Sequence, residues 1–480
     1  MSGQHSVEKI GGTSMAATAV LFDNVLIAGR KGADLYNRVF VVSAYAGMTD
    51  LLLEHKKSGE PGVYARFVAD DGADGWRHAI ETVRTAMHGR NADMFARAES
   101  LAEANAFVDA RIDAVAACLD DLARLRSHGR FCVKEQLVTV RELLAGLGEA
   151  HSAHSTALLL RDRGVNACFV DLTLWDQQDM RGLDERIEQA FAPIDLATTL
   201  PIVTGYAGCS EGMVRRYARG YSEMTFSRIA VLTQAREAII HKEFHLSSAD
   251  PKLVGTDKAR KIGRTNYDVA DQLANLGMEA IHPRAAKGLR QDNIPLRVKN
   301  TFEPEHGGTL IDGEYTSERP CVEIIAGRKQ VYALEVFDQD MVGSLWDYEQ
   351  KILSAISRFK ATVITKDINA NTITHYLGTN LKTVKRIVNA VNDEFTTAEV
   401  STRKVAIVSA IGSDMKVPGM LAKTVSALAS ADISVLAMHQ SMRQVDMQFV
   451  INEDDYEAAV ANLHRCLVEV HDHGEAICVA

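Results

Sequence analysis

Several sequence features that define common protein classes are absent from this chain. None of the seven cysteines forms a C-x-x-C pair, and their odd number does not fit a disulfide framework, so we predict a reduced, cytoplasmic protein without a zinc site. No window approaches about 18 consecutive apolar residues, the length that a membrane-spanning helix needs. The first residues show neither a basic region nor an apolar run, so no signal peptide is predicted.

The chain also has fewer basic than acidic residues, with 53 Lys and Arg against 63 Asp and Glu. The formal net charge is -10 at pH 7, which argues against bulk electrostatic binding to nucleic acid or to an anionic membrane. Any site for an anion must therefore be local. A metal site is not predicted either, because His151 and His154 lie three positions apart without a third ligand.

The residues that are present support a globular α/β protein. The 480 residues are 46% hydrophobic and 24% charged, the balance of a soluble chain with about two to four domains. Up to residue 311, short apolar strands alternate with amphipathic helices, which predicts an α/β fold with a largely parallel sheet. Residues 76–130 are expected to be mostly helical.

The pattern changes after a polar, turn-rich stretch near residue 318. Two later segments share one design, in which a strand, a loop with an acidic residue and a glycine, a helix and another strand follow each other. We interpret them as a tandem repeat of a small βαββαβ, ferredoxin-like module. The predicted limits are 1–318 for the first domain, 330–395 for the first module, which a C-terminal strand at 470–480 could complete, and 403–470 for the second module.

The hexamer KIGGTS, residues 9–14, stands where the first strand should become the first helix. Gly11 and Gly12 would let backbone N–H groups approach an anion, and Lys9 would place a mobile cation beside it, as suits a transferring phosphoryl group. A tight turn with a solvated lysine explains the hexamer alone equally well. Because it matches neither G-x-x-x-x-G-K-[ST] nor G-x-G-x-x-G, a P-loop ATPase and a Rossmann dehydrogenase are disfavoured.

Further motifs follow the hexamer in a specific order. The seven in sequence are KIGGTS, VVSAYAGMTD, GEAHS, RGYSEMT, SSADPKLVG, LGMEAIHPRA and HGGTLI. Together they resemble the aspartate kinase family, over most of the chain. The resemblance implies an amino-acid kinase fold followed by tandem ACT modules, which bind an amino-acid effector. It also implies phosphorylation of the β-carboxylate of L-aspartate by ATP, with Mg²⁺ bridging the phosphates.

A carboxylate is already a nucleophile, so this reaction would need no general base and would depend on positioning and charge neutralisation. By resemblance, Lys9 neutralises the transferred group and Glu223 organises that lysine. Glu149 is expected to bind the substrate ammonium and Arg219 a substrate carboxylate. The hydroxyl groups expected in the same site are those of Ser43, Thr49 and Ser222.

The nucleotide is expected at the glycine turn and at the loop SSADPK. The residues implied are Gly11, Gly12, Ser14, Lys242, Ser247, Asp250 and Lys252. Simpler explanations stay open for several positions. Glu149 and Arg219 could be exposed charges, Ser43 could bond to its own turn, and SSADPK could be an ordinary proline-containing turn.

Three departures separate this chain from the usual family pattern. The motif R-G-G-S-D has Tyr221 for its second glycine and Glu223 for its aspartate, which moves the carboxylate by about 1 Å or more. The Thr-Asp pair near the adenine is replaced by His241 and Lys242, and the lysine of F-G-A-K is replaced by Glu279. We therefore expect the nucleotide to be held differently, with a nearby lysine compensating.

With these departures, the chain resembles the divergent aspartate kinases associated with ectoine biosynthesis. Membership of that subgroup would imply reduced feedback inhibition. Gln339 replaces a usual glycine of the effector loop, which is expected to weaken effector binding. Two other functions stay open, namely a catalytically impaired ACT-containing amino-acid sensor and a kinase for another acidic amino acid. A homo-oligomer is expected because ACT modules bury sheet edges or helix faces, although they could also pair within one chain.

Overall fold

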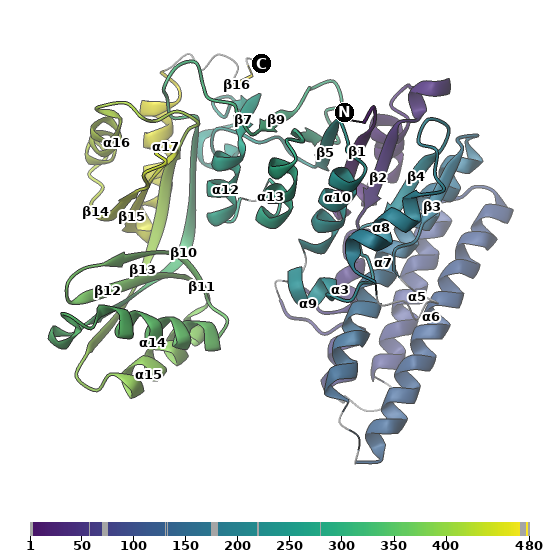
Figure 1. Cartoon of the computed structure of the whole chain (residues 1–480), viewed down its shortest axis with the longest axis horizontal. Helices are drawn as coiled ribbons and strands as arrows, with labels where there is room; N and C mark the ends of the chain where they lie inside the picture. Colours follow the sequence, from purple (N-terminus) through teal and green to yellow (C-terminus); the bar gives the residue numbers. More distant parts are fainter. Residues whose placement is uncertain are drawn as a thin grey trace. The chain divides into compact units, whose positions relative to one another are not determined.

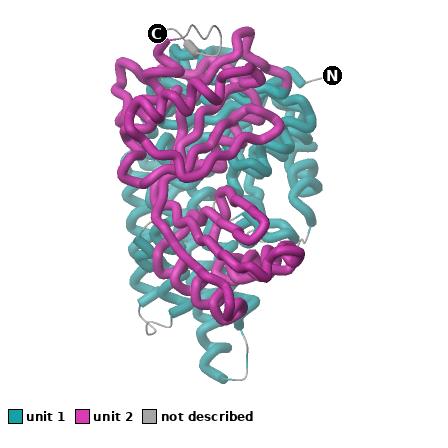
Figure 2. Tube along the Cα trace, turned by 90° about the vertical axis from the view of Figure 1, so that its left-hand side faces the viewer, with its two compact units in different colours: residues 1–245, 281–313 teal, residues 246–280, 314–480 magenta. Residues whose placement is uncertain are grey.

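The computed structural model divides the chain into two compact units (Figure 2), unit 1 with residues 1–245 and 281–313, and unit 2 with residues 246–280 and 314–480. It describes residues 3–56, 58–69, 75–129, 131, 133–173, 181–217, 220–278, 280–470 and 477–478. Residues 246–280, which precede the predicted boundary at 318, thus belong to the same unit as the C-terminal modules. The domain limits drawn from the sequence stay a prediction.

Unit 1 is built on a sheet whose strands are almost all parallel. In the described part of this unit the strand order is β3 (Ala167–Val170), β4 (Leu200–Thr204), β2 (Arg38–Val42), β1 (Ser6–Ile10), β5 (Glu237–Lys242), β8 (Leu296–Asn300) and β9 (Thr309–Asp312). Only the β8–β9 pair in this series is antiparallel. Every residue of β2 and β4 is buried, as expected of parallel strands covered on both faces. The predicted α/β fold is confirmed.

Helices cover this sheet and extend beyond it (Figure 1). The long helix α7 packs against β3 and β4, and α6 packs against α7. Residues 144–160 of α7 are all buried, because the helix lies between the sheet and other helices. The helical segments of unit 1 are α1 (Gly12–Ala16), α2 (Thr18–Leu21), η1 (Phe22–Leu26), η2 (Gly32–Leu35), α3 (Met48–Leu52), α4 (Val63–Ala69), α5 (Gly75–Met94), α6 (Ala98–Ser127), α7 (Lys134–Asp162), α8 (Leu183–Phe191), α9 (Met213–Tyr217), α10 (Tyr221–Leu232) and α13 (Pro283–Gln291).

Unit 2 contains the two predicted modules and the segment 246–280. Its larger sheet has the order β11 (Thr362–Ile368), β12 (Thr372–Gly378), β10 (Ile324–Phe337), β13 (Glu399–Ile411), β15 (Asp446–Asn452) and β14 (Val435–Gln440). The remaining elements are α11 (Pro251–Val254), β6 (Lys261–Ile262), β7 (Arg264–Asn266), α12 (Tyr267–Asn275), η4 (Gln339–Met341), α14 (Leu345–Arg358), α15 (Leu381–Glu394), α16 (Met420–Ala429), η5 (Glu453–Asp455), α17 (Tyr456–Leu467) and β16 (Ile477–Cys478).

The two modules share their long strands β10 and β13. These strands pair over two segments, with a register shift between Arg328 and Val331. The part of β13 at 399–405 completes the first module beside β10, and the part of β10 at 324–328 completes the second module beside β13. The predicted tandem repeat is present, with the difference that the second module takes one of its strands from β10, which precedes it in the chain. The C-terminal strand has another partner than expected: β16 pairs with β6, because β13 follows α15 directly and already occupies the open edge of the first module.

Candidate active site

The turn after β1 requires glycine for a steric reason. A Cβ on Gly12 would lie 2.8 Å from the carbonyl oxygen of Ala44, in the loop that follows β2. The carbonyl of Gly12 accepts a hydrogen bond from the N–H of Ala46, at 3.1 Å. The two loops at the carboxyl ends of these neighbouring strands therefore touch, at the edge where parallel α/β sheets bind ligands.

Lys9 and Glu223 form an ion pair beside this turn. Lys9 is the fourth residue of β1 and Glu223 lies in the first turn of α10, and their Nζ and Oε1 atoms are 3.5 Å apart. Burial would raise the pKa of Glu223, but the charges of Lys9 and Lys242 and the backbone N–H of His282 lower it overall. Glu223 is therefore an anion that holds the Lys9 ammonium.

The extra methylene of Glu223 has a structural partner. The N–H of His282 donates to Oε2 of Glu223, while Oε1 faces Lys9. The other substitution in this motif also fits locally, because Tyr221 is buried and its ring lies 5.6 Å from that of Tyr206. Gly220 is retained, and a Cβ there would lie 2.5 Å from the ring of His282. The sequence did not single out His282, since the group that it contributes is a backbone N–H.

Glu149, Ser222 and Ser43 form a second cluster. The hydroxyl of Ser222 donates to Oε1 of Glu149 at 3.1 Å, and the hydroxyl of Ser43 lies 3.5 Å from that of Ser222. Oε2 of Glu149 is buried and has no hydrogen-bond partner among the described residues. A Cβ on Gly205 would lie 2.7 Å from Cβ of Ser222 and 2.9 Å from this oxygen. A glycine thus makes room for a buried carboxylate.

The electrostatics of Glu149 favour a cationic ligand. Burial raises the pKa of Glu149 to about 8, although the hydroxyl of Ser222, the charge of Lys9 and the backbone N–H groups of Tyr206 and Ala44 act in the opposite direction. Near neutral pH the carboxyl group therefore favours its protonated form. An ammonium group placed against it would restore the ionised form.

Three other predicted site residues, Thr49, Lys242 and Ser14, also belong to unit 1. Thr49 belongs to α3 and is partly buried, one residue after the start of the helix. Lys242, also partly buried, ends β5, the strand next to β1. Ser14 is fully buried, and its hydroxyl accepts a hydrogen bond from that of Thr301 at 2.9 Å. The Ser14 hydroxyl thus serves packing in this structure.

The remaining predicted nucleotide residues lie in unit 2. Ser247 donates to the carbonyl of Ala249 at 2.7 Å. Asp250 caps α11 by accepting from the N–H of Lys252 at 2.9 Å, and the Lys252 side chain is exposed. The predicted Arg219, like the substituted position 279, lies outside the described residues.

His241, one of the departures from the family pattern, has a partner inside the sheet. Its Nε2 atom lies 2.7 Å from Oε2 of Glu8, and Nε of Arg38 lies 2.8 Å from Oε1 of the same carboxylate. All three side chains are buried, and Arg38 also donates to the carbonyls of Val25 and Leu26. His241 therefore serves a buried charge cluster next to Lys9 in sequence, which the charged residues in otherwise apolar strands could have indicated.

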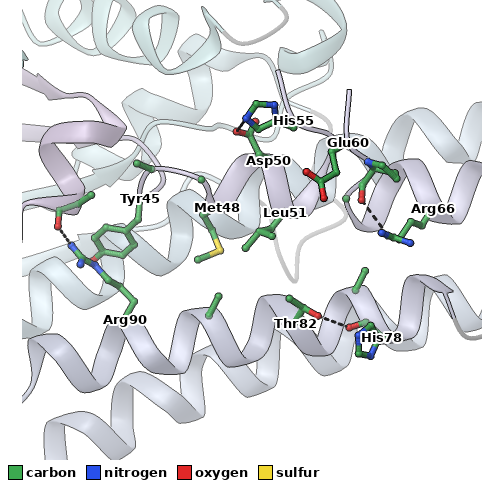
Figure 3. A pocket seen from close by; sticks show the side chains of 17 residues that line it. Tyr45, Met48, Asp50, Leu51, His55, Glu60, Arg66, His78, Thr82 and Arg90 are labelled. Carbon is green, nitrogen blue, oxygen red and sulfur yellow. Dashed lines mark hydrogen bonds and ion pairs between the residues drawn. The ribbon is translucent and has the colours of Figure 1, made fainter. Parts of the chain in front are cut away.

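A cavity of about 760 Å³ is lined by the segment that follows β2 and by the helix α5 (Figure 3). Its walls include Tyr45 of that segment, Met48 of α3 and several residues of α5. Arg90 of α5 stacks over the Tyr45 ring at 4.7 Å and donates to the carbonyl of Met15 at 3.1 Å. These contacts attach Tyr45 and the helix α1 to α5.

Comparisons with known proteins agree with this arrangement. The model of the amino acid kinase family matches residues 6–300, and an ACT domain model matches residues 408–467. The aspartate kinase Ask_Ect of Stutzerimonas stutzeri (strain A1501) is 55% identical over 476 residues, which cover 99% of this chain and all of the relative. The aspartokinase of Candida albicans is 24% identical over 68% of each chain.

Solved structures show the same fold along nearly the whole chain. E. coli aspartokinase III in complex with lysine and aspartate has a TM-score of 0.75 at 19% identity, over 97% of this chain and 100% of that chain. The same enzyme in complex with aspartate and ADP has a TM-score of 0.71 at 19% identity, over 96% and 99%. Since the family model matches residues 6–300 and a relative is 55% identical over its full length, the chain belongs to the amino acid kinase family and, within it, to the aspartate kinases.

Proposed function

We propose that the chain transfers the γ-phosphoryl group of ATP to the β-carboxylate of L-aspartate, giving 4-phospho-L-aspartate and ADP. The observation that carries the proposal is the pairing of the Lys9–Glu223 ion pair with the buried Glu149–Ser222–Ser43 cluster at one edge of the sheet. The full-length relative is named an aspartate kinase, and E. coli aspartokinase III was solved with aspartate and ADP.

The two charge clusters suit the two ends of the substrate. The carboxylate of aspartate is the nucleophile, so the site has to align it with the γ-phosphorus and neutralise charge as the phosphoryl group moves. Lys9 supplies that positive charge, and Glu223 keeps its ammonium in place. Glu149 binds the substrate ammonium, with Ser43, Thr49 and Ser222 as neighbouring hydroxyls and with Arg219 on a carboxylate.

ATP is proposed to lie along Gly11 and Gly12, with Lys242 and the loop of Ser247, Asp250 and Lys252 as further contacts. Mg²⁺ usually reaches such sites with several waters and the substrate phosphates, and few protein ligands. No group of three or more His, Cys, Asp or Glu among the described residues is arranged to hold a metal. An ion that accompanies the nucleotide would neutralise phosphate charge.

An ATP-dependent hydroxamate assay with L-aspartate tests the proposal. We expect turnover with L-aspartate, and a loss of at least about a hundredfold in kcat for Lys9→Met, since the lysine acts on the group in transit. Turnover with another acidic amino acid but not with aspartate would point to the alternative kinase. A folded protein that turns over neither substrate would point to an amino-acid sensor.

The proposal extends to effector binding and to oligomerisation. Among the relatives, E. coli aspartokinase III was solved with lysine. We expect an amino-acid effector at the ACT modules here to bind weakly, because Gln339 lies in the short helix η4 of the effector loop. The label Ask_Ect agrees with an ectoine-associated subgroup, and we propose a homo-oligomer, which sedimentation would measure.

No described helix is long and apolar enough to cross a membrane.

A further inference from the structure

The nucleotide loop SSADPK is attached to the second ACT module through Ser248. This serine is fully buried, and its hydroxyl lies 2.8 Å from Nε2 of His464, on α17. The N–H of Arg260 donates to the same hydroxyl oxygen at 3.0 Å. His464 is also fully buried, and its Nδ1 atom lies 3.1 Å from Oε1 of Glu469.

These contacts fix the direction of each hydrogen bond. A carboxylate only accepts, so Nδ1 of His464 carries the proton that faces Glu469. Burial lowers the pKa of His464, against the opposing effect of Glu469, so the ring is neutral and Nε2 has a free lone pair. The Ser248 hydroxyl therefore donates to His464 while it accepts from Arg260.

The backbone of Ser248 is held on both sides. Its N–H donates to the carbonyl of Arg260 at 2.8 Å, and its carbonyl accepts from the N–H of Ile325, in β10, at 2.7 Å. The helix that Asp250 caps, α11, packs against α17. Ser247 and Asp250 thus flank a residue whose side chain and backbone are both held by hydrogen bonds within unit 2.

We propose that His464 is a positioning residue for the nucleotide, which sets the Ser248 hydroxyl and through it the neighbouring loop residues. This inference rests on the proposed function, because it takes the loop of Ser247 and Asp250 as a nucleotide contact. His464 itself is buried and does not touch ATP. It acts on the affinity for ATP through the loop of Ser247 and Asp250, which lies in unit 2 with α17.

Two substitutions at position 464 separate the two bonds of the ring. The side-chain oxygen of His464→Gln reaches the place of Nε2 and can accept from Ser248, whereas the shorter amide of His464→Asn reaches the place of Nδ1 and keeps only the contact with Glu469. Ser248→Ala removes the hydroxyl itself. Melting temperature and circular dichroism verify that all three variants fold.

For His464→Asn and for Ser248→Ala we expect the KM for ATP to rise roughly fivefold, the effect of one buried hydrogen bond, with kcat and the KM for aspartate unchanged. His464→Gln is expected to restore the wild-type KM for ATP. The double variant Ser248→Ala/His464→Asn should be no worse than Ser248→Ala alone, because the serine substitution already removes the bond to His464.

Equal KM values for ATP in His464→Asn and wild type would overturn the inference, as would a parallel rise in the KM values for both substrates in all variants. Calorimetric titration with ADP keeps the two proposals apart. If wild type binds ADP but does not phosphorylate aspartate, the proposed function fails, while weaker ADP binding by His464→Asn would still support His464 as a positioning residue. Unchanged ADP binding by the folded Ser248→Ala variant would reject it.

Discussion

The longer carboxylate at position 223 offers the most direct test of how this site is organised. Glu223→Asp shortens the side chain by one carbon–carbon bond, about 1.5 Å. The present separation of 3.5 Å from Lys9 would grow to about 5 Å. Both side chains are largely buried, with exposed fractions of 12% and 16%, so an effective dielectric constant of about 20 is appropriate.

With these values the attraction between the two charges falls from about 4.7 to about 3.3 kcal/mol, a loss of about 1.4 kcal/mol. If that attraction holds Nζ of Lys9 at the transferred phosphoryl group, kcat falls about tenfold. Loss of the hydrogen bond from the His282 N–H to Glu223 would add about 1 kcal/mol, which brings the expected decrease to about fiftyfold.

Steady-state kinetics by the hydroxamate assay would measure this decrease, with the melting temperature as a check on folding. Glu223→Gln is the matched control, because it keeps the side-chain length and can still accept from His282, but it removes the charge. We expect its kcat to fall at least as far as that of Glu223→Asp. Wild-type kcat in Glu223→Asp would refute the reasoning, since the contact geometry would then have no part in activity.

Four further predictions concern Glu149, Ser14 and Arg38. The pKa of Glu149 is raised to about 8, chiefly by burial, so the KM for aspartate should fall several-fold from pH 7 to pH 9, and Glu149→Gln should abolish this dependence. Because its folded-state pKa lies above the ordinary value of 4.5, Glu149 favours the folded state at low pH, and this contribution is lost as pH rises to about 8, which urea unfolding of the protein without substrates would detect. Ser14→Ala should leave the KM for ATP nearly unchanged and cost about 1 kcal/mol of stability, because the hydroxyl bonds to Thr301; a large rise in this KM would contradict that assignment. Arg38→Met should lower the free energy of unfolding by about 3–5 kcal/mol, as measured by denaturant titration, because it leaves the Glu8 carboxylate buried without its guanidinium; a loss below about 1 kcal/mol would be inconsistent with a buried pair.

The sequence predicted those features that depend on local order along the chain. The glycine turn after the first strand was visible in KIGGTS, because close approach of two backbones demands residues without a side chain, and Gly12 does face Ala44. The alternation of strands and helices was sufficient for a parallel sheet. Lys9, Glu149 and Glu223 were identified by resemblance, and the structure brings their side chains together around Ser222.

Features that depend on distant pairing were not visible. The modules exchange strand segments across β10 and β13, and only the register of two strands far apart in sequence reveals it. Ser14 follows the motif in which a hydroxyl would meet phosphate, yet Thr301, which buries it, comes from the far end of the same unit. A residue pattern cannot show that the N–H of His282 binds Glu223, because every residue except proline has a backbone N–H. Such contacts are decided by tertiary packing.

The distribution of charge in the site also bears on the two alternative functions. Lys9 and Lys242 lower the pKa of Glu223, so positive charge gathers on the side of the glycine turn. Glu149 is buried, and its Oε2 atom has no hydrogen-bond partner among the described residues. A substrate with a free ammonium at one end and a carboxylate at the other satisfies both groups. An N-acylated amino acid has no ammonium group, so it could not form an ion pair with Glu149 or lower the raised pKa of that carboxyl group. The pattern therefore favours a free acidic amino acid over an acetylated one, and a pure sensor would have no need of the Lys9–Glu223 pair.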